Sequence, residues 1–466
     1  MSEELVAKMR SAGVPEAAIR AFGRHLARFA AGGEGLLDHV AISPVDELRD
    51  AATLEAFRPA GERALGRLAV VRLNGGLGTG MGLERAKSLL AVRDGLTFLD
   101  LIARQVLALR EATGARVPLL LMNSFRTEQD SLAALAPYAD LGLPGLPLSF
   151  VQNQVPKILI STLGPARAPG NPELEWCPPG HGDLYLALAT SGLLHRLLER
   201  GVQFAFVANA DNLGAAVDTA LLGFMASNGI DLLLEAADRA DSDRKGGHLC
   251  RLQDGRLALR EAAQCPPAEE AEFQDVNLYR YFNTNSLWLH LPSLDRLLAS
   301  HDGVLPLTPI FNRKTLDPRD KTSPAVVQIE TAMGSALTVF PRATAVRVPR
   351  TRFSPVKTTD DLLAVRSDAY ELLPDGRVAL DPSRPSPPMV ALDSRYYRFV
   401  DELDRRFPGG PPSLRRCESL RVTGDVSFGA GVVAVGRVHV RAMGGRGEVA
   451  AGAELEGDVV LGREPA

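Results

Sequence analysis

Hydrophobic residues near the start of the chain recur at helical spacing. Ile19, Phe22, Leu26 and Phe29 follow one another at intervals of three or four residues, with charged residues and glycines between them. That spacing places apolar side chains along one face of a helix. The pattern predicts a helical N-terminal segment over residues 1–66, with breaks at the glycines.

From residue 68 onward, short apolar runs alternate with helical patterns. Runs typical of buried strands cover residues 68–73, 118–122, 204–209, 230–236, 286–291 and 343–348. Helical patterns begin near Thr97 and at Asp183, the second ending at Gly201. Helices that alternate with buried strands predict an α/β fold with a Rossmann-like, doubly wound mixed sheet over residues 67–373.

The end of the chain follows another period. An apolar residue recurs at every sixth position there, at Leu420, Val426, Val432 and Val438. This period favours a C-terminal left-handed β-helix over residues 415–466, in which three short strands form each coil. An ordinary β-meander is the alternative, because the repeat is short and MGGRG interrupts it. The stretch 374–414 begins rich in Pro, Ser and Asp, and we expect a linker there.

Composition excludes several classes of protein. The formal net charge of -4 over 466 residues leaves no overall basic field to hold nucleic acid or an anionic membrane. The four cysteines are scattered without a C-x-x-C pair, so neither a disulfide framework nor a structural zinc site is indicated. The charged start MSEELVAKMR and the lack of a long apolar run predict a cytoplasmic protein, neither exported nor membrane-spanning.

The strongest local signal for chemistry is LNGGLGTGMGLERAKSLL at 73–90. Glycines let backbone N–H groups approach phosphate oxygens closely, and Lys87 can neutralise them. A flexible turn is the alternative. The glycines lack the G-x-G-x-x-G spacing of a dinucleotide fingerprint, and Ala86 before Lys87 excludes a Walker A loop.

This loop resembles the nucleotide-binding signature of the eukaryotic-type UTP-glucose-1-phosphate uridylyltransferases. The resemblance runs from about residue 65 to the end of the chain and implies a nucleotidyltransferase fold of the GT-A-like kind. Further motifs occur in the order of that family: MNSF (122–125), Gln152 with PKI (156–158), PPGHGD (178–183), NADNLGA (209–215), RKGG (244–247), FNTNSLW (282–288), IETAMG (329–334) and VPRTRFSPVKTTDDLL (348–363).

The resemblance implies a nucleotide site and a metal site. The nucleotide site would comprise Leu73, Asn74, Gly75, Gly76, Met122, Gln152 and Gly180. Gln152 is a sensible reader of uracil, whose edge alternates acceptor, donor and acceptor, although a buried structural glutamine is the alternative. Asp211 follows a strand and is the candidate ligand of Mg²⁺, which needs one carboxylate when phosphates and waters complete its shell. A turn or cap aspartate is the alternative there.

The sugar phosphate would be met by a second set, namely His181, Asn209, Gly247, Glu261, Asn283, Asn285 and Lys357, with Glu330 and Thr331 nearby. Amides and a carboxylate suit the hydroxyls of a hexose. Because side chains alternate along a strand, the two asparagines of FNTN are expected on one side, with turn asparagines as the alternative. Lys357 would bind the phosphate of glucose 1-phosphate, and Arg350 and Arg352 would make its surroundings basic; a solvated basic loop is the alternative.

The implied reaction converts UTP and glucose 1-phosphate into UDP-glucose and pyrophosphate by in-line attack at the α-phosphorus, with Lys87, Lys357 and Mg²⁺ neutralising charge. A pyrophosphorylase for UDP-N-acetylhexosamine or several UDP-sugars is the neighbouring alternative. A catalytically silent subunit whose β-helix is the working interface is another, and a nicotinamide dehydrogenase is weakened by the missing fingerprint. Self-association through the β-helix is a further expectation. All motifs precede residue 415, so removal of the tail is expected to leave part of the activity.

Overall fold

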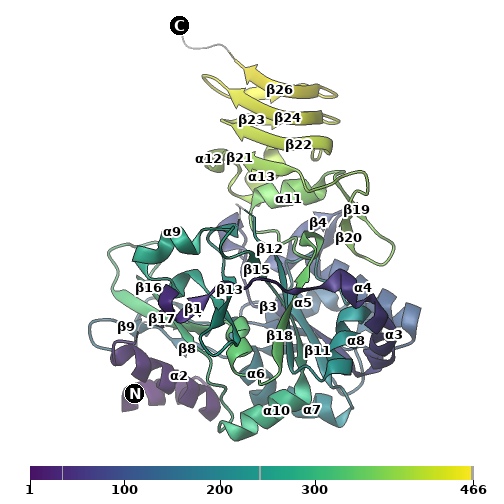
Figure 1. The fold of residues 1–466 in the computed structure, drawn as a ribbon. Helices are drawn as coiled ribbons and strands as arrows, with labels where there is room; N and C mark the ends of the chain where they lie inside the picture. Colours follow the sequence, from purple (N-terminus) through teal and green to yellow (C-terminus); the bar gives the residue numbers. More distant parts are fainter. Residues whose placement is uncertain (34, 241–242, 463–466) are drawn as a thin grey trace.

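The computed structural model describes residues 1–33, 35–240 and 243–462, and a mixed sheet lies at its centre (Figure 1). The spatial order of the strands along the main path of this sheet is β2 (Arg49–Asp50), β18 (Ala343–Val348), β12 (Leu232–Asp238), β15 (Tyr281–His290), β11 (Phe204–Asn209), β3 (Leu68–Asn74), β6 (Leu119–Asn123) and β7 (Ser149–Val151). Along this path only β15 runs antiparallel to its neighbours. Beside β15 the sheet continues into β13 (His248–Leu252), β14 (Leu257–Arg260) and β1 (Ile42–Ser43). The α/β mixed sheet predicted from the apolar runs is confirmed.

Helices pack on both faces of this sheet. One hydrophobic core includes side chains of α6 (Leu184–Thr190), α7 (Leu193–Glu199) and α10 (Leu291–Ser300), and the core on the other face includes α3 (Arg58–Ala64), α4 (Phe98–Thr113), α5 (Glu128–Leu135) and α8 (Thr219–Asn228). Thr97 and Asp100 form a capping box at the start of α4, and Gly114 with φ +69° ends it.

The prediction of a single helix from Asp183 to Gly201 is wrong. Asp183 closes a short 3₁₀ turn, and the helical stretch is divided into α6 and α7. Gly192 lies between them with φ +70°, a left-handed conformation that interrupts a right-handed helix.

The N-terminal segment is helical only in part. The helices α1 (Glu3–Ser11) and α2 (Glu16–Ala30) pack against a small layer with β8 (Val155–Pro156) and β17 (Ala325–Thr331). The strands β1 and β2 instead join the central sheet by pairing with β13 and β18. Further small sheets contain β16 (Pro309–Thr315) with β17 and β9 (Ile158–Leu159), β10 (Trp176–Cys177) with β8, and β4 (Ala91–Arg93) with β5 (Leu96–Thr97).

The C-terminal strands stack in parallel at the top of Figure 1. One stack contains β21 (Met389–Leu392), β22 (Ser413–Thr423), β24 (Val433–Ala442) and β26 (Glu454–Leu461), and β23 (Val426–Phe428) pairs in parallel with β25 (Gly447–Val449). Leu420 pairs with Val438, so one coil takes eighteen residues, or three six-residue repeats. A β-meander would need antiparallel neighbours, and that alternative is therefore excluded.

The stretch 374–414, expected to be a linker, is largely folded. It contains β20 (Val378–Leu380), which pairs with β19 (Tyr370–Leu372), as well as β21, α12 (Ser394–Tyr397) and α13 (Val400–Arg406). Tyr397 is fully buried and donates a hydrogen bond from its hydroxyl to the carbonyl of Val426, at 2.5 Å. The prediction failed because loop-like composition covers only part of this stretch.

The core of the C-terminal unit extends to residues far earlier in the chain. It includes Met81 and Leu90 from the glycine-rich segment, Val92 from β4, and side chains of α11 (Thr359–Arg366). Gly82 of the same segment packs against the ring of Phe399, to which an added Cβ would approach within 3.1 Å. The remaining helix, α9 (Glu270–Phe273), lies after β14. None of the described helices has the length and apolar character needed to cross a membrane.

Candidate active site

Three parallel strands of the central sheet end together. Asn74 at the end of β3 pairs with Asn123 at the end of β6, and Leu73 pairs with Asn209 at the end of β11. In open α/β sheets ligands bind at this carboxyl edge. A cavity of about 290 Å³ lies there, lined by Leu73, Asn74, Gly75, Gly76, Lys87, Ser88, Met122, Gln152, Pro178, Gly180, His181, Asn209, Ala210 and Asp211. The structure thus brings all seven predicted nucleotide residues together with Lys87, His181, Asn209 and Asp211.

Two glycines allow the close packing at the nucleotide end of this cavity. A Cβ on Gly75 would lie 2.7 Å from Nε2 of Gln152, so any other residue would displace that amide. Gly180 has φ +80°, and a Cβ there would lie 2.5 Å from the carbonyl oxygen of Thr331. The side chain of Asn74 is instead used within the protein, since its amide donates to Asn123 Oδ1 and Ser131 Oγ at 2.6 and 2.8 Å.

The phosphate end of the cavity carries one close ion pair. Lys87 Nζ lies 2.5 Å from Asp211 Oδ2, and the two side chains are 18% and 21% exposed. The lysine reaches this point because the backbone N–H of Lys87 donates to the carbonyl of Gly76, folding the glycine-rich loop back on itself. A partly exposed carboxylate at the cavity wall fits a Mg²⁺ ion that takes its other oxygens from phosphates and water. The described residues contain no cluster of three or more metal-ligating side chains.

His181 contributes a neutral donor rather than a cation. Burial lowers its pKa to about 4, so the ring is uncharged near neutral pH. Its Nδ1 accepts a hydrogen bond from the backbone N–H of Met333 at 3.0 Å. The ring proton therefore resides on Nε2, which is left to donate to a ligand.

Four of the predicted sugar residues form a second cluster. A Cβ on Gly247 would lie 2.5 Å from Oε2 of Glu261, so only glycine fits against this carboxyl. The Asn283 backbone N–H donates to the Gly247 carbonyl at 3.2 Å, and the Asn283 side-chain amide donates to Asn285 Oδ1 at 3.1 Å. Burial raises the pKa of Glu261 to about 7.

The two asparagines of FNTN lie together, as expected, but not through regular strand alternation. The pairing of β15 with β12 skips two residues, since Glu235 pairs with Ser286 and Ala236 with Asn283. Asn285 lies in this bulge with φ +57°, a left-handed conformation that asparagine tolerates better than most residues. The bulge explains why Asn283 and Asn285 contact each other directly.

Lys357 lies outside the cavity. Its side chain is exposed, with Nζ 5.7 Å from the ring centroid of Phe353. The segment before it nevertheless runs beside the metal candidate, because the N–H of Val356 donates to the carbonyl of Asp211 at 3.2 Å. The backbone of Lys357 thus follows directly on a residue that is hydrogen-bonded to Asp211, whereas the ammonium group of Lys357 lies in solvent.

The expectation that Arg350 and Arg352 make the surroundings of Lys357 basic is wrong. Arg350 pairs with Asp243 at 2.6 Å, and Arg352 pairs with Glu235 at 2.7 Å. Both guanidinium groups are neutralised by carboxylates more than 100 residues away in the sequence, a distance that no local pattern reveals.

Some residues of the cavity wall and its support were not predicted. Ser88, Pro178 and Ala210 line the cavity within motifs already singled out. Thr331, expected near the sugar, supports the loop at Gly180: its N–H donates to the Pro179 carbonyl at 2.9 Å. Glu330, expected beside it, lines a small cavity behind this loop, together with Asp183.

The fold and the site are those of a nucleotidyltransferase: a mixed α/β sheet with a glycine-rich loop and a lysine–aspartate pair at its carboxyl edge. The model of the family described as UTP-glucose-1-phosphate uridylyltransferase matches residues 20–434. The chain belongs to this family, and the resemblance seen in its motifs is confirmed.

Individual relatives agree along most of their length. The UTP-glucose-1-phosphate uridylyltransferase of Solanum tuberosum is 40% identical over 82% of this chain and 79% of its own, and that of Saccharomyces cerevisiae is 40% identical over 85% and 79%. A mutant UDP-glucose pyrophosphorylase from Leishmania major, solved in complex with UDP-glucose, superimposes with a TM-score of 0.92 at 43% identity, covering 100% of both chains. The UDP-glucose phosphorylase from Trypanosoma brucei gives 0.89 at 40% identity, over 98% and 99%.

Proposed function

We propose that the protein transfers UMP from UTP to glucose 1-phosphate, releasing pyrophosphate and forming UDP-glucose. One observation carries the proposal. A single cavity at the carboxyl edge of the sheet joins the Gln152–Gly75 contact, suited to a nucleobase, to the Lys87–Asp211 pair, suited to metal-bound phosphates. Membership of the uridylyltransferase family supports the choice of uracil and of glucose.

The chemistry requires one bond to form and one to break. A phosphate oxygen of glucose 1-phosphate attacks the α-phosphorus of UTP, and the bond from that phosphorus to the oxygen that joins it to the β-phosphorus breaks in line with the attack. This oxygen leaves with pyrophosphate. The nucleophile is already ionised near neutral pH, so no general base is needed. What the protein supplies is orientation and charge neutralisation.

At the nucleotide end, we assign the uracil contact to Gln152 and the ribose and phosphate contacts to the backbone of the glycine-rich loop. The wall of this end would be completed by Leu73, Asn74, Gly75, Gly76, Met122 and Gly180, which all line the cavity. The amide of Gln152 offers both a donor and an acceptor, which suits the alternating edge of uracil.

At the phosphate end, Asp211 would hold Mg²⁺ together with oxygens of the triphosphate. The ion, when bound, neutralises charge on those oxygens. Lys87 now pairs with Asp211, and engagement of that carboxylate by the ion would free the ammonium group to face the phosphates. Two opposite charges are therefore held at the position where each is needed.

At the sugar end, we assign the hexose hydroxyls to Asn209, Gly247, Glu261, Asn283 and Asn285, with the neutral Nε2–H of His181 as a further donor. Four of these residues form the contact cluster described above. Lys357 would bind the phosphate of glucose 1-phosphate. Its exposed ammonium group has to turn from solvent toward the cavity for this contact.

A coupled assay of pyrophosphate release tests the proposal. We expect release only when UTP, glucose 1-phosphate and Mg²⁺ are all present, and little release when TTP replaces UTP. Equal or faster turnover with N-acetylglucosamine 1-phosphate would contradict the sugar assignment. Unchanged turnover with CTP, whose base has an amino donor in place of the O4 acceptor of uracil, would contradict the assignment of Gln152.

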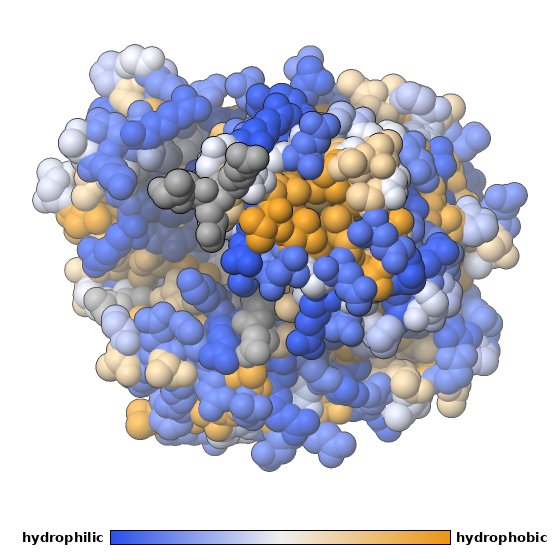
Figure 2. All heavy atoms as spheres, turned by 90° about the horizontal axis from the view of Figure 1, so that it is seen from above, coloured by the Kyte–Doolittle hydropathy of each residue, from blue (hydrophilic) through white to orange (hydrophobic). Residues whose placement is uncertain are grey.

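We also propose that the parallel coils form a left-handed β-helix whose outer end binds a second copy of this chain. Along the described chain, β26 pairs only with β24, so its other edge is unpaired. Val460 on this strand is 50% exposed, and Figure 2 shows an apolar patch at this end of the molecule. An identical edge can extend the parallel stack or cover its open core.

Light scattering after gel filtration tests the self-association. We expect an oligomer that Val460→Arg converts to monomer, whereas Met389→Arg, at a more exposed site on β21, leaves it intact. A monomeric starting protein would contradict the proposal. We further propose a cytoplasmic location, which is supported by the four cysteines, all described and all unpaired.

A further inference from the structure

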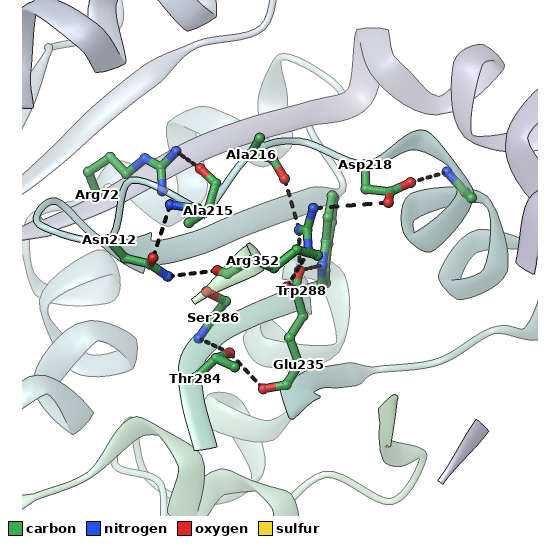
Figure 3. A network of polar contacts seen from close by, with 12 residues as sticks. Arg72, Asn212, Ala215, Ala216, Asp218, Glu235, Thr284, Ser286, Trp288 and Arg352 are labelled. Atoms are coloured by element: carbon green, nitrogen blue, oxygen red, sulfur yellow. Dashed lines mark hydrogen bonds and ion pairs between the residues drawn. The ribbon is translucent and has the colours of Figure 1, made fainter. Parts of the chain in front are cut away.

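A buried carboxylate that does not line the cavity has several polar contacts, which Figure 3 shows. Glu235 on β12 is fully buried. Its two carboxylate oxygens accept hydrogen bonds from Nε and Nη2 of Arg352, both at 2.7 Å, and one of them also accepts from the indole N–H of Trp288 at 2.9 Å. Such a two-pronged contact fixes the plane of the guanidinium group.

Arg352 links this carboxylate to the turn after β11. Its Nη2 also donates to the carbonyl of Ala216 at 2.9 Å. Asn212, the residue after Asp211, donates from its amide to the Arg352 carbonyl at 3.1 Å and accepts from the N–H of Ser354 at 2.9 Å. The segment around Arg352 and the turn that carries Asp211 are thus joined by three hydrogen bonds, as Figure 3 shows in part.

The close contact between these two segments depends on a glycine. A Cβ on Gly214 would lie 2.3 Å from the carbonyl oxygen of Thr351. Beyond this point the two segments remain paired, because the N–H of Leu213 donates to the Ser354 carbonyl and the N–H of Val356 donates to the Asp211 carbonyl. Lys357 is the next residue along the chain.

The same glutamate is linked to the sugar end. The hydroxyl of Thr284 donates to the backbone carbonyl of Glu235 at 2.7 Å, and the N–H of Ser286 donates to that hydroxyl at 3.2 Å. Thr284 lies in the bulge between Asn283 and Asn285. Glu235 is therefore linked to three proposed parts of the site. Arg352 connects it to the segments of Asp211 and Lys357, and Thr284 connects it to the bulge with the sugar amides.

We propose that Glu235 and Arg352 are positioning residues, which fix the Lys357 segment relative to Asp211 and to the bulge with Asn283 and Asn285. The inference rests on the proposed roles of Lys357 and Asp211. Arg352 is 13% exposed and Glu235 is not exposed, and neither lines the cavity, so they act through the residues that they hold. Lysine cannot replace Arg352 in this role, because an ammonium group lacks the planar fork.

The simplest competing view is that the pair only stabilises the fold. A control ion pair exists at the other end of β12 and β18. Arg342 and Asp231 directly precede β18 and β12, and their side chains pair at 2.9 Å at the end of the sheet away from the cavity. Arg342→Gln therefore removes an ion pair between the same strands without touching the Lys357 segment.

The test compares Arg352→Lys with Arg342→Gln. For Arg352→Lys we expect kcat/KM for glucose 1-phosphate to fall roughly 10- to 100-fold, because a displaced phosphate ligand misaligns the attacking group. UTP binding, measured by calorimetry, should change less than about threefold, because Gln152 and the glycine-rich loop are held by other strands. Arg342→Gln should lower the melting temperature and leave both quantities unchanged. A folded Arg352→Lys protein with normal kinetics would overturn the inference.

A double-mutant cycle with Lys357→Ala separates this inference from the proposed function. If Arg352 acts through Lys357, Arg352→Lys should cost less than about threefold for glucose 1-phosphate once Lys357 is absent. Normal turnover of Lys357→Ala alone would refute the role of Lys357 itself. If the fold-losses in kcat/KM of the two single variants multiply in full in the double variant, the positioning role is refuted and the proposed function is not.

Arg352→Lys keeps the positive charge but loses the planar fork that satisfies both oxygens of the buried Glu235, so this variant can fail to fold. The double variant Glu235→Gln/Arg352→Gln removes both charges and preserves most of the volume. We expect it to fold and to show the same selective loss for glucose 1-phosphate. If it folds and keeps wild-type kinetics, the positioning role is overturned.

Discussion

At the scale of single residues, the proposed site holds its charges in pairs before any substrate arrives. Lys87 and Asp211 neutralise each other at the cavity wall, with 2.5 Å between the ammonium nitrogen and the carboxylate oxygen. His181 remains uncharged because burial lowers its pKa to about 4. Within the cavity, the proposed ligands would therefore meet one paired cation and one neutral donor, while the ammonium group of Lys357 is still in solvent.

Asp211→Asn should act through the metal. The amide keeps the volume of the side chain but binds Mg²⁺ weakly, and Lys87 loses its partner. We expect kcat/KM to fall about 100-fold at low Mg²⁺ and to recover in part at high Mg²⁺. Kinetics across a Mg²⁺ titration, with thermal melts as the folding control, measure this. Unchanged activity with unchanged Mg²⁺ dependence would remove Asp211 from the metal site.

Gly75→Ala should weaken UTP selectively. The added Cβ would lie 2.7 Å from Nε2 of Gln152, and this flexible side chain can move away at little cost to the fold. We expect KM for UTP to rise roughly tenfold, with KM for glucose 1-phosphate nearly unchanged, because a displaced amide no longer reads the base. Gly66→Ala, where a Cβ meets open space, is the matched control. Equal changes for both substrates would contradict a base-reading role.

Glu261 should make stability depend on pH. Burial raises its pKa from 4.5 to about 7, so the folded protein binds a proton that the unfolded chain has released at intermediate pH. Its contribution is fully present below about pH 4.5 and is lost as the pH rises through about 7. We expect Glu261→Gln to reduce the loss of unfolding free energy between pH 5 and 8 by roughly 2 kcal/mol. Urea titrations of both proteins without substrate measure this, and parallel pH profiles would refute it.

At the scale of elements, the bulge in β15 determines how the two asparagines proposed to bind the sugar are arranged. Thr284 fixes this bulge through the Glu235 carbonyl at 2.7 Å. A regular strand would place Asn283 and Asn285 on one face as well, but without their direct contact or the left-handed φ of Asn285. The bulge therefore shapes the sugar end of the site.

Thr284→Val should test that bulge, because valine keeps the shape of threonine and lacks its hydroxyl. We expect a loss of about 1–2 kcal/mol in unfolding free energy, from the unsatisfied carbonyl, and a several-fold rise in KM for glucose 1-phosphate. Thr344→Val on β18, which is separated from β15 by β12, is the control. A loss of stability without any change in KM would show that the bulge is structural only.

At the scale of the whole molecule, the C-terminal coils share a core with the catalytic part. Met81 and Leu90 of the glycine-rich segment and the side chains of α11, which follows Lys357, pack in the same cluster as the coils. Both proposed phosphate lysines are therefore next to segments that depend on the tail for their packing.

Deletion of residues 415–466 should consequently abolish activity, rather than leave part of it as the order of the motifs alone suggests. The deletion exposes core residues such as Leu414 and Tyr397, both fully buried. Removal of residues 450–466 is the control, which retains β22 to β25 and should keep most of the activity. Activity and circular dichroism of both variants measure this. A folded 1–414 protein with near-normal turnover would contradict the expectation.

The sequence by itself determined the strands and the composition of the site. Apolar runs such as 68–73 and 204–209 are buried on both faces of the sheet. A strand of this kind is recognised from its own continuous apolar run, without knowledge of which strands lie beside it. The glycine-rich loop and NADN follow these strands directly, and the parallel sheet brings their ends together. Eleven predicted residues accordingly line one cavity.

Only the tertiary structure decided how charges and segments are partnered. The pairing of Arg352 with Glu235, the exposure of Lys357, the bulge at Asn285 and the sharing of a core by the tail and the glycine-rich loop depend on contacts between residues far apart in the chain. Hydrophobic period and motif spacing report the local environment of a residue. They contain no information on which distant carboxylate neutralises an arginine or which strand pairs out of register, because those contacts exist only after the chain has folded.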